Sequence, residues 1–439
     1  MEISGNNVIP PAELDYHVKS VRKYRVSDIG RSSWFDQHEI LVKIHQQAAL
    51  EAREKREEFV KDGLIVEGKI KILVHNAYCL LVWKHKVLPD LLGRDLNPQS
   101  SFIFYTILFH EATIVAILET LLYHGEACEA LEECSLDLID YCLQGIIQMI
   151  SLSEEDEDLP QNDGIGEEIE KHKKSFVFRI GIRCLTILSF LADNLEKISL
   201  SASNRLMEIH DTPCVLSEIL HKRPWLRRRE SGFEKFIEDE WQPVAGDEIS
   251  RVTKAEAHTW FCLRELLLNP VTFTKYEVKN FRQREISKCQ GLLHDVLLDQ
   301  LPPLVDLKSF LVALSVSGDS NSGRAKEKKL LLEEIPQIRE ELMAEIEGEG
   351  SAGIAEKIYR NLCSDNCPDL KGIASKLTKT YNLDVLEAFL PKKSRNIDSF
   401  CAVCTQPASK KCSKCLTTHY CSRDCQVKHW KIHKSSCKK

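Results

Sequence analysis

Glycine and proline are scarce in this sequence. Its 439 residues include 19 glycines and 15 prolines, so its Leu- and Ile-rich stretches contain few turn signals. No stretch shows the alternation of apolar and polar residues that a half-buried strand needs. These absences predict an all-α protein, and the chain is long enough to bury a large core.

The sequence also lacks a secretory signal and a clean membrane span. Residues 1–30 contain no apolar run. The best membrane candidate is the segment 102–123, but His110, Glu111 and Glu119 interrupt it, and charged side chains at mid-span are costly in lipid. We therefore expect this segment to be a helix buried in protein. The chain is expected to be intracellular, with no membrane contact.

Signals for catalysis are weak, and the sequence predicts no enzyme. It contains no Gly-rich phosphate loop. His110 and Glu111 begin like a zinc-protease helix, but position 114 is isoleucine, so the second histidine is missing and His110 is expected to lie in the core. The basic run HKRPWLRRRE (221–230) contains one aromatic residue. We favour a solvated turn after a helix for this run over an anion site.

Polar segments divide the chain into helical blocks. Nine acidic residues lie between positions 154 and 170, so the segment 153–174 is expected to be a solvated loop. Short helices joined by short loops favour an irregular armadillo- or HEAT-like body. An irregular bundle is the alternative, since no repeat of 34 or 40–47 residues is evident. The expected parts are an N-terminal helical block (1–152), the acidic loop, a second helical block (175–314), a linker (315–329), a C-terminal helical segment (330–391) and a cysteine-rich segment (401–437).

Three amphipathic segments carry the clearest helical patterns outside the apolar core. Residues 39–63 contain no glycine before Gly63 and predict one long helix. Residues 328–349 predict a charged helix after the linker. Residues 369–390 predict the last helix before the cysteine-rich segment.

Charge is unevenly distributed along the chain. Residues 392–439 hold 12 Lys/Arg and 2 Asp/Glu, a formal charge of +10, whereas the preceding 391 residues hold 47 and 64, a formal charge of −17. A basic tail can indicate nucleic-acid binding. It equally suits a tail that docks on acidic protein, or a solvated surface. Because the long helical part is acidic, we expect no direct contact with nucleic acid.

The 17 cysteines form two populations. Ten are scattered between Cys79 and Cys367 with no recurring spacing, and core packing as small hydrophobic residues accounts for most of them. The other seven lie between Cys401 and Cys437. In an intracellular protein, such a concentration indicates metal binding and not a disulfide framework.

The cysteine-rich segment has the spacing C-x2-C-x7-C-x2-C-x5-C-x3-C-x7-H-x3-C. Eight ligands supply two closed four-coordinate zinc sites with no position for a catalytic water, so both Zn²⁺ ions are expected to be structural. The segment is too small to build its own core, and each zinc must supply folding free energy, about 10–16 kcal/mol in finger peptides. The candidate ligands are Cys401, Cys404, Cys412, Cys415, Cys421, Cys425, His433 and Cys437.

This spacing resembles that of the MYND zinc finger, and the flanking pattern CQxxHW (425–430) also occurs in that family. His429 is a rival ligand because it lies one turn from both Cys425 and His433. Family members often carry other residues at that place, so His433 is preferred. The resemblance implies two interleaved sites, with Cys401, Cys404, Cys421 and Cys425 on one zinc and Cys412, Cys415, His433 and Cys437 on the other.

MYND fingers bind proline-containing peptides, which the resemblance makes an expected partner here. The positions that match the family's groove are Gln426 and Trp430, four residues apart on the last helix. An exposed indole suits the flat faces of an extended proline segment, and an amide can bond its backbone. The alternative is that Trp430 packs under the zinc knuckles, with Val427 and Ile432 as its apolar underside.

Proteins with this finger include SET-domain methyltransferases and transcriptional co-repressors. The methyltransferases carry it inserted within the enzyme, whereas no SET cofactor motif is evident in this sequence. The co-repressors carry it near the C-terminus, as here. A nuclear co-repressor or scaffold is therefore the alternative function, motivated by the basic finger.

A third resemblance extends over most of the chain, to the MYND-finger axonemal dynein arm assembly factors (the BLU family). It implies a cytoplasmic adaptor or co-chaperone for the folding and preassembly of axonemal dynein arms in cells with motile cilia, concentrated near the centrosome or centriolar satellites at the ciliary base. The implied partners are a leucine-rich-repeat dynein assembly factor, an Hsp90-type chaperone system and dynein arm subunits. The segments that carry it are FDQHEILVKIHQQAAL (35–50), FHEATIVAILETLLYH (109–124), VLLDQLPPLVDLKSFL (296–311) and YNLDVLEAFLPKK (381–393).

Overall fold

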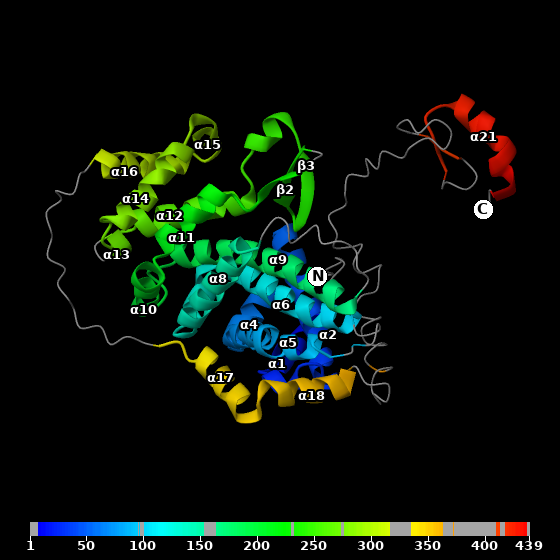
Figure 1. Ribbon diagram of the computed structural model, residues 1–439, viewed down its shortest axis with the longest axis horizontal. Coiled ribbons are helices and arrows are strands. Elements are labelled where there is room, and N and C mark those ends of the chain that lie inside the picture. The colour runs from blue at the N-terminus through cyan, green and yellow to red at the C-terminus, as the bar shows by residue number, and fades with distance from the viewer. Residues whose placement is uncertain are drawn as a thin grey trace. The chain divides into compact units, whose positions relative to one another are not determined.

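The computed structural model describes residues 8–94, 96, 101–152, 164–229, 232–273, 276–316, 335–362, 372, 410–412 and 418–436. The chain divides into two compact units, Met1–Leu377 and Thr378–Lys439 (Figure 1). We call the first unit the body and the second the finger unit. The two large helical blocks predicted from the sequence belong to the same unit.

The body is helical along almost all of its described length, and its N-terminal part contains only helices. These are α1 (Pro11–Ser20), η1 (Val26–Asp28), α2 (Ser32–Glu54), α3 (Phe59–Val66), α4 (Lys69–Lys86), α5 (Leu88–Leu92), α6 (Ser101–Leu122), α7 (Gly125–Glu129) and α8 (Cys134–Ile150).

The following part adds further helices and one small sheet. Its elements are α9 (Ile165–Asp193), α10 (Leu200–Asn204), η4 (Arg205–Ile209), α11 (Thr212–Lys222), β1 (Leu226–Arg229), β2 (Gly232–Ile237), β3 (Glu240–Val244), η5 (Gly246–Ser250), α12 (Lys254–Leu268), α13 (Pro270–Phe273), α14 (Phe281–Ser287), η6 (Lys288–Leu292), α15 (Asp295–Gln300), η7 (Pro302–Leu304) and α16 (Val305–Val316). The irregular all-α body predicted from the sequence is confirmed.

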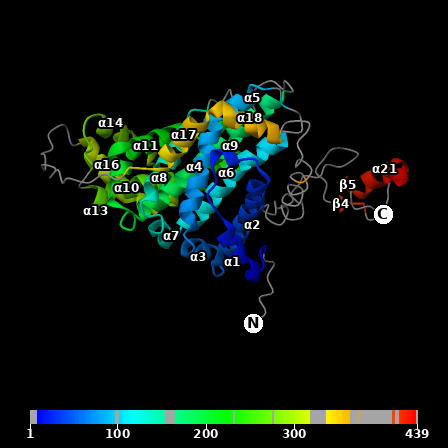
Figure 2. The ribbon, with the colours of Figure 1, turned by 90° about the horizontal axis from the view of Figure 1, so that it is seen from below.

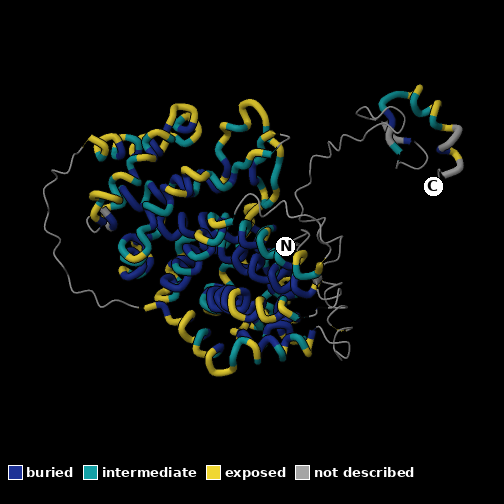
Figure 3. The backbone as a smooth tube through the Cα atoms, in the orientation of Figure 1, coloured by how far each residue is buried: buried dark blue, intermediate teal, exposed yellow. Residues whose placement is uncertain are grey.

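Helix α9 is the centre of the core. It packs against α6 and α8 from the N-terminal part and against α12 from the later part. Two described helices, α6 and α9, are long and apolar enough to cross a membrane, but 72% and 78% of their apolar windows are buried inside the body. Figure 3 shows that buried residues predominate along these central helices. Burial in protein therefore accounts for the apolar character of the segment 102–123.

Several of the polar groups buried in this core are hydrogen-bonded to one another. His38 Nδ1 of α2 lies 2.8 Å from His110 Nδ1 of α6, so the prediction of a core histidine is confirmed. Lys84 Nζ of α4 donates to Glu111 Oε2 at 2.6 Å, and the Tyr141 hydroxyl of α8 donates to Glu111 Oε1 at 2.9 Å. Glu111, one of the charges that interrupt the apolar segment, thus ties helices α4, α6 and α8 together.

The small antiparallel sheet, of order β1–β2–β3, is a feature that the sequence did not predict. The run 221–230, interpreted as a solvated turn, instead ends α11 and forms strand β1, and the adjoining Trp225 is fully buried. Residues Glu238 and Asp239 form the two-residue loop between β2 and β3 with φ of 51° and 63°. Neither is glycine or asparagine, the usual residues of such hairpin loops, so the turn signal was missing from the sequence.

Helices α17 (Ile338–Glu349) and α18 (Ser351–Leu362) return to the N-terminal part of the body. Helix α17 packs on α4 and α18 packs on α5, as Figure 2 shows. Helix α18 also contacts η1. The Ile338 amide donates to Asp137 Oδ1 of α8 at 3.0 Å. The helix predicted at 369–390 lies outside the described residues, apart from Gly372.

Two boundaries differ from the sequence-based expectations. The helix predicted at 39–63 is divided, because Lys55 adopts a left-handed conformation (φ 52°) that ends α2. Glu51 then accepts a hydrogen bond from the Val60 amide at 3.1 Å, at the start of α3. Helix α9 begins at Ile165, ten residues before the expected start of the second block. Glu167 and Glu168 lie in its first turn, where acidic side chains favour a helix N-terminus.

Most of the scattered cysteines are buried free thiols, as predicted. Cys79, Cys142, Cys184 and Cys262 are at most 2% exposed. Burial raises the pKa of the partly exposed Cys134 to about 12. Cys134 is therefore protonated near neutral pH, and the buried cysteines pack as small hydrophobic groups.

Candidate metal centre

The finger unit is built on a short hairpin and one helix. Strand β4 (Lys410–Lys411) pairs antiparallel with β5 (His419–Tyr420), and the chain then enters helix α21 (Arg423–Ser436). The Cys412 amide donates to the Thr418 carbonyl at 2.9 Å, which extends the hairpin beyond β4. The Ser422 hydroxyl accepts from the Cys425 amide at 3.3 Å and caps the start of α21.

Cys421 and Cys425 form the clearest half of a metal site. Their sulfur atoms lie 3.6 Å apart. Two thiolates on one tetrahedral zinc, each at about 2.3 Å from the metal, are separated by about 3.8 Å. Two of the four cysteines that the resemblance places on the first zinc therefore have the spacing that a shared ion requires.

Cys412 and His433 belong to the second predicted site, and both are buried. Cys412 forms a buried cluster with Tyr420, and Cys421 and Cys425 pack against this cluster. His433 is 5% exposed, and its ring lies 6.4 Å from the Tyr420 ring. Tyr420 thus lies among candidate ligands of both predicted sites.

The other four predicted ligands, Cys401, Cys404, Cys415 and Cys437, lie outside the described residues. Within the described part of the chain, no group of three or more candidate ligands comes together. The assignment of eight ligands to two ions therefore stays a prediction. The four described side chains are sulfur and imidazole donors placed around Tyr420, and these are the donor types that structural zinc uses.

His429, the rival ligand, has a partner of its own. Its Nδ1 atom lies 2.9 Å from the Tyr420 hydroxyl, and its ring stacks on that of His433 at 5.7 Å. These contacts give His429 a place in the packing of α21 that requires no metal.

The opposite side of α21 is exposed. Trp430 is 41% exposed and Val427 is 63% exposed, while Gln426 is partly exposed. Val427 is therefore largely exposed, and the side chain of Ile432, the other residue of the packing alternative, lies outside the described residues. Trp430 does contact the edge of the His433 ring, with 6.0 Å between ring centroids.

Two cations extend this exposed side of the helix. Arg423, Val427, Trp430 and Lys434 are all exposed and recur at the three- and four-residue spacing of one helix face. Val427 was predicted from the sequence only as an apolar underside for Trp430 and not as part of this exposed face, although its i,i+3 spacing from Trp430 was the available signal. We call Arg423, Val427, Trp430 and Lys434 the outer face of α21.

Comparisons with known proteins identify the family of the finger and relatives of the chain. Residues 401–437 match the MYND finger family. Over 454 aligned residues the chain is 41% identical to the Zinc finger MYND domain-containing protein 10 homolog of Drosophila melanogaster, with 99% of each chain covered.

Two further relatives match over short segments only. The SET domain and MYND-type zinc finger protein 6 of Schizosaccharomyces pombe is 34% identical over 79 residues, which is 18% of this chain and 14% of that protein. A SET and MYND domain-containing protein of Dictyostelium discoideum is 62% identical over 29 residues, 7% of this chain and 5% of that protein. No solved structure shows a significant match to the chain.

Proposed function

Because the chain belongs to the zinc finger MYND domain-containing protein 10 family, we propose that it is a non-enzymatic adaptor and co-chaperone for the folding and preassembly of axonemal dynein arms in cells with motile cilia. A MYND finger implies zinc binding and is a module for contacts with other proteins. The full-length match supports a shared architecture of helical body and finger. The resemblance of the segments 35–50 and 296–311 to the dynein arm assembly factors supports the cellular role.

The division of α21 into two sides is the observation that carries the adaptor function. Cys425, His429 and His433 recur every four residues along the side that contacts Tyr420. Val427 and Trp430 occupy the other side and are exposed. Bound zinc would supply the free energy that holds this small unit folded. The finger's own residues would then present the outer face to a partner peptide.

The outer face suits a short, extended, proline-containing segment. The Trp430 indole offers a flat apolar surface, Val427 adds an apolar contact beside it, and the Gln426 amide can bond a peptide backbone. We assign the leucine-rich-repeat assembly factor to this finger, and the Hsp90-type chaperone system and dynein arm subunits to the body.

Affinity purification from ciliating cells followed by mass spectrometry tests this function. Tagged full-length protein is expected to recover dynein arm subunits, chaperones of the Hsp90 system and a leucine-rich-repeat assembly factor. Recovery of chromatin proteins without any of these would contradict the proposal.

Cell fractionation tests the proposed location. The adaptor is expected in the cytoplasm, with a fraction near the centrosome or centriolar satellites at the ciliary base. A strictly nuclear protein would instead support the co-repressor function, which the formal +10 charge of residues 392–439 favours.

The number of metal ions has its own test. We propose two structural Zn²⁺ ions per chain, one on each predicted set of four ligands. Native mass spectrometry of the purified full-length protein should show the mass of two zinc ions. A single ion at saturating zinc would rule out the eight-ligand assignment.

A further inference from the structure

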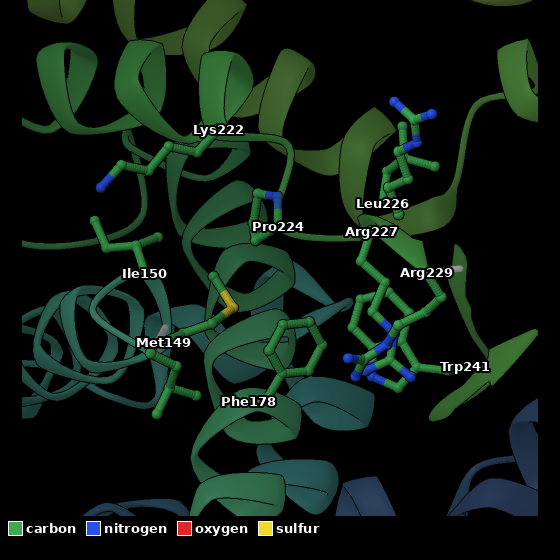
Figure 4. Close-up of a pocket in the computed structure, with 11 residues that line it drawn as sticks. Met149, Ile150, Phe178, Lys222, Pro224, Leu226, Arg227, Arg229 and Trp241 are labelled. Atoms are coloured by element: carbon green, nitrogen blue, oxygen red, sulfur yellow. The ribbon is translucent and has the colours of Figure 1, made fainter. Parts of the chain in front are cut away.

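A basic cleft lies on the body between the ends of α8 and α11, helix α9 and the small sheet. It consists of two adjoining cavities of about 230 Å³ and 420 Å³. Both cavities are lined by Leu152, Phe178, Arg227, Arg229 and Trp241, which makes them one continuous feature. Figure 4 shows the first cavity, with Arg227, Arg229 and Trp241 together on the sheet side and Met149 and Phe178 on the helix side.

The strand register explains why these side chains share the cleft. Arg227 pairs with Glu234 and Phe236 pairs with Trp241, so all four project from the same face of the sheet. Arg229, two residues from Arg227, lies on that face as well. The sequence run LRRR thus places two arginines over a pair of aromatic rings, because side chains alternate along a strand.

The floor of the cleft is aromatic and rigid. The Phe178 ring of α9 lies 5.2 Å from the Trp241 ring and 4.9 Å from the Phe236 ring. The Arg227 guanidinium lies 3.9 Å above the Trp241 ring, and its Nε donates to Glu234 at 2.8 Å. These contacts hold the arginine in one orientation over an apolar surface.

The rim carries an excess of positive charge. The first cavity is lined by the cations Lys222, Arg227 and Arg229 and by no acidic residue, although Lys222 pairs with Glu218 and Arg227 pairs with Glu234 outside the lining. The second adds three more cations together with Asp239 and Glu240, of which Asp239 pairs with Arg183. The cations of the two cavities are Lys171, Lys174, Arg179, Lys222, Arg227 and Arg229, whereas Arg228 projects from the other face of the sheet over Phe233. This concentration contrasts with the formal −17 charge of residues 1–391.

We propose that the basic cleft is a binding site for an acidic peptide segment of a partner protein. Its carboxylates would bond the arginines and lysines of the rim, since Arg matches carboxylate geometry and charge-assisted bonds are the stronger ones. One apolar side chain of the peptide would lie on the floor formed by Phe178 and Trp241. Charge complementarity between this rim and an acidic segment identifies the occupant.

Two observations favour a peptide over a nucleic acid. Arg227 covers the face of Trp241 on which a base would stack. The acidic side chains of Asp239 and Glu240 line one part of the cleft, where a continuous polyanion would be repelled. A peptide can place separate carboxylates opposite separate cations and avoid this region.

Fluorescence anisotropy with the full-length, zinc-loaded protein tests the proposal. The probe is a fluorescein-labelled peptide of Asp and Glu residues around a central Leu, and the control probe replaces the acids by Asn and Gln. The variant K222Q/R229Q removes two rim cations. The matched control R284Q/K308Q removes two exposed cations that line neither cavity. Circular dichroism confirms that both variants keep the helical fold.

The acidic probe should bind, and added salt should weaken it. K222Q/R229Q should weaken binding by at least about tenfold, the effect of losing one charge-assisted bond, while R284Q/K308Q and Trp430→Ala should leave it unchanged. Equal binding of the neutral probe, equal weakening in the control variant, or preferential binding of an oligothymidine would overturn the proposal. A peptide with this chain's own residues 153–163 is a further probe. If it binds more tightly than the acidic probe, the cleft binds a segment of this chain, and the proposal of a partner protein is overturned.

Discussion

The histidine pair in the core makes the body sensitive to acid. His38 is fully buried between Trp34 and His110. Burial lowers the pKa of His38 to about 3, and the pKa of His110 lies well below its usual value for the same reason. The unfolded chain takes up a proton on each imidazole near pH 6.5, whereas the folded body excludes it. The two neutral imidazoles therefore cost the body no stability above that pH, and the free energy of unfolding decreases as the pH falls from 6.5 toward 3.

The variant His38→Asn tests this effect. Asparagine keeps a polar atom near the position of Nδ1 but cannot titrate. Between about pH 7 and pH 5.5, the native protein should lose roughly 1 kcal/mol more unfolding free energy than the variant. Urea unfolding followed by tryptophan fluorescence measures this difference, and equal losses would show that His38 is protonated in the folded body.

Glu111 is the second residue whose replacement has a predictable cost. It accepts hydrogen bonds from Lys84 and Tyr141, and the side chains of Lys84 and Glu111 are 3% and 2% exposed. Glu111→Leu leaves the Lys84 ammonium buried without its carboxylate, so stability should fall by about 3–5 kcal/mol.

The double variant K84M/E111L is the matched control for this prediction. It replaces both charges by apolar groups of similar size, and it should recover most of the loss in urea unfolding. If the double variant does not recover the lost unfolding free energy, the shape of the side chains, and not the unpaired Lys84 charge, determines the loss of stability.

At the scale of elements, the close approach of α8 and α9 depends on a glycine. A Cβ at Gly181 would lie 2.5 Å from Met149 Cβ, which cannot move without shifting α8. Gly181→Ala should therefore destabilise the body by about 1–3 kcal/mol. Gly166→Ala, in the first turn of the same helix, meets nothing within 4 Å and should be neutral or stabilise by about 0.5 kcal/mol. Thermal unfolding of the two variants compares them, and equal effects would contradict this account.

The helices could be predicted from the sequence because their signals are local. The apolar segment 102–123 has the length and composition of a core helix, and its buried polar residues find partners in the core. The sheet could not be predicted in this way. Leu226–Arg229 has no apolar alternation, and its position depends on the distant pairing of Arg227 with Glu234 and Phe236 with Trp241. The close contact of Gly181 with Met149 is likewise a consequence of packing and not of local pattern.

For the finger, individual candidate ligands could be predicted from the sequence, whereas for the body only the helices could, because metal-ligand spacing is itself a local pattern. The pair Cys421 and Cys425 was recognisable from its i,i+4 spacing. The bond between Tyr420 and His429 was not, since it depends on how the hairpin meets α21. The exposure of Val427 was also hidden, because an apolar residue in a small unit is usually assigned to its core.

At the scale of the whole molecule, the two units should respond separately to metal removal. All predicted zinc ligands lie in the finger unit, Thr378–Lys439. Chelation, or Cys421→Ala, should unfold α21 and leave the body helices intact, because zinc supplies most of the finger's folding free energy. Circular dichroism should then show only a small loss of helix signal. Extensive loss of body helicity would contradict the independence of the two units.

The central claim is that the outer face of α21 binds a partner while the inner side holds the fold. Trp430→Ala tests it most directly, with partner recovery from ciliating cells and zinc content by native mass spectrometry measured on the same protein. Buried aromatic anchors of interfaces often contribute 2 kcal/mol or more, about thirtyfold in affinity. We predict that Trp430→Ala abolishes recovery and Gln426→Ala weakens it, with the zinc content of both unchanged. Zinc loss in the tryptophan variant, or full recovery of the partner, would contradict the account.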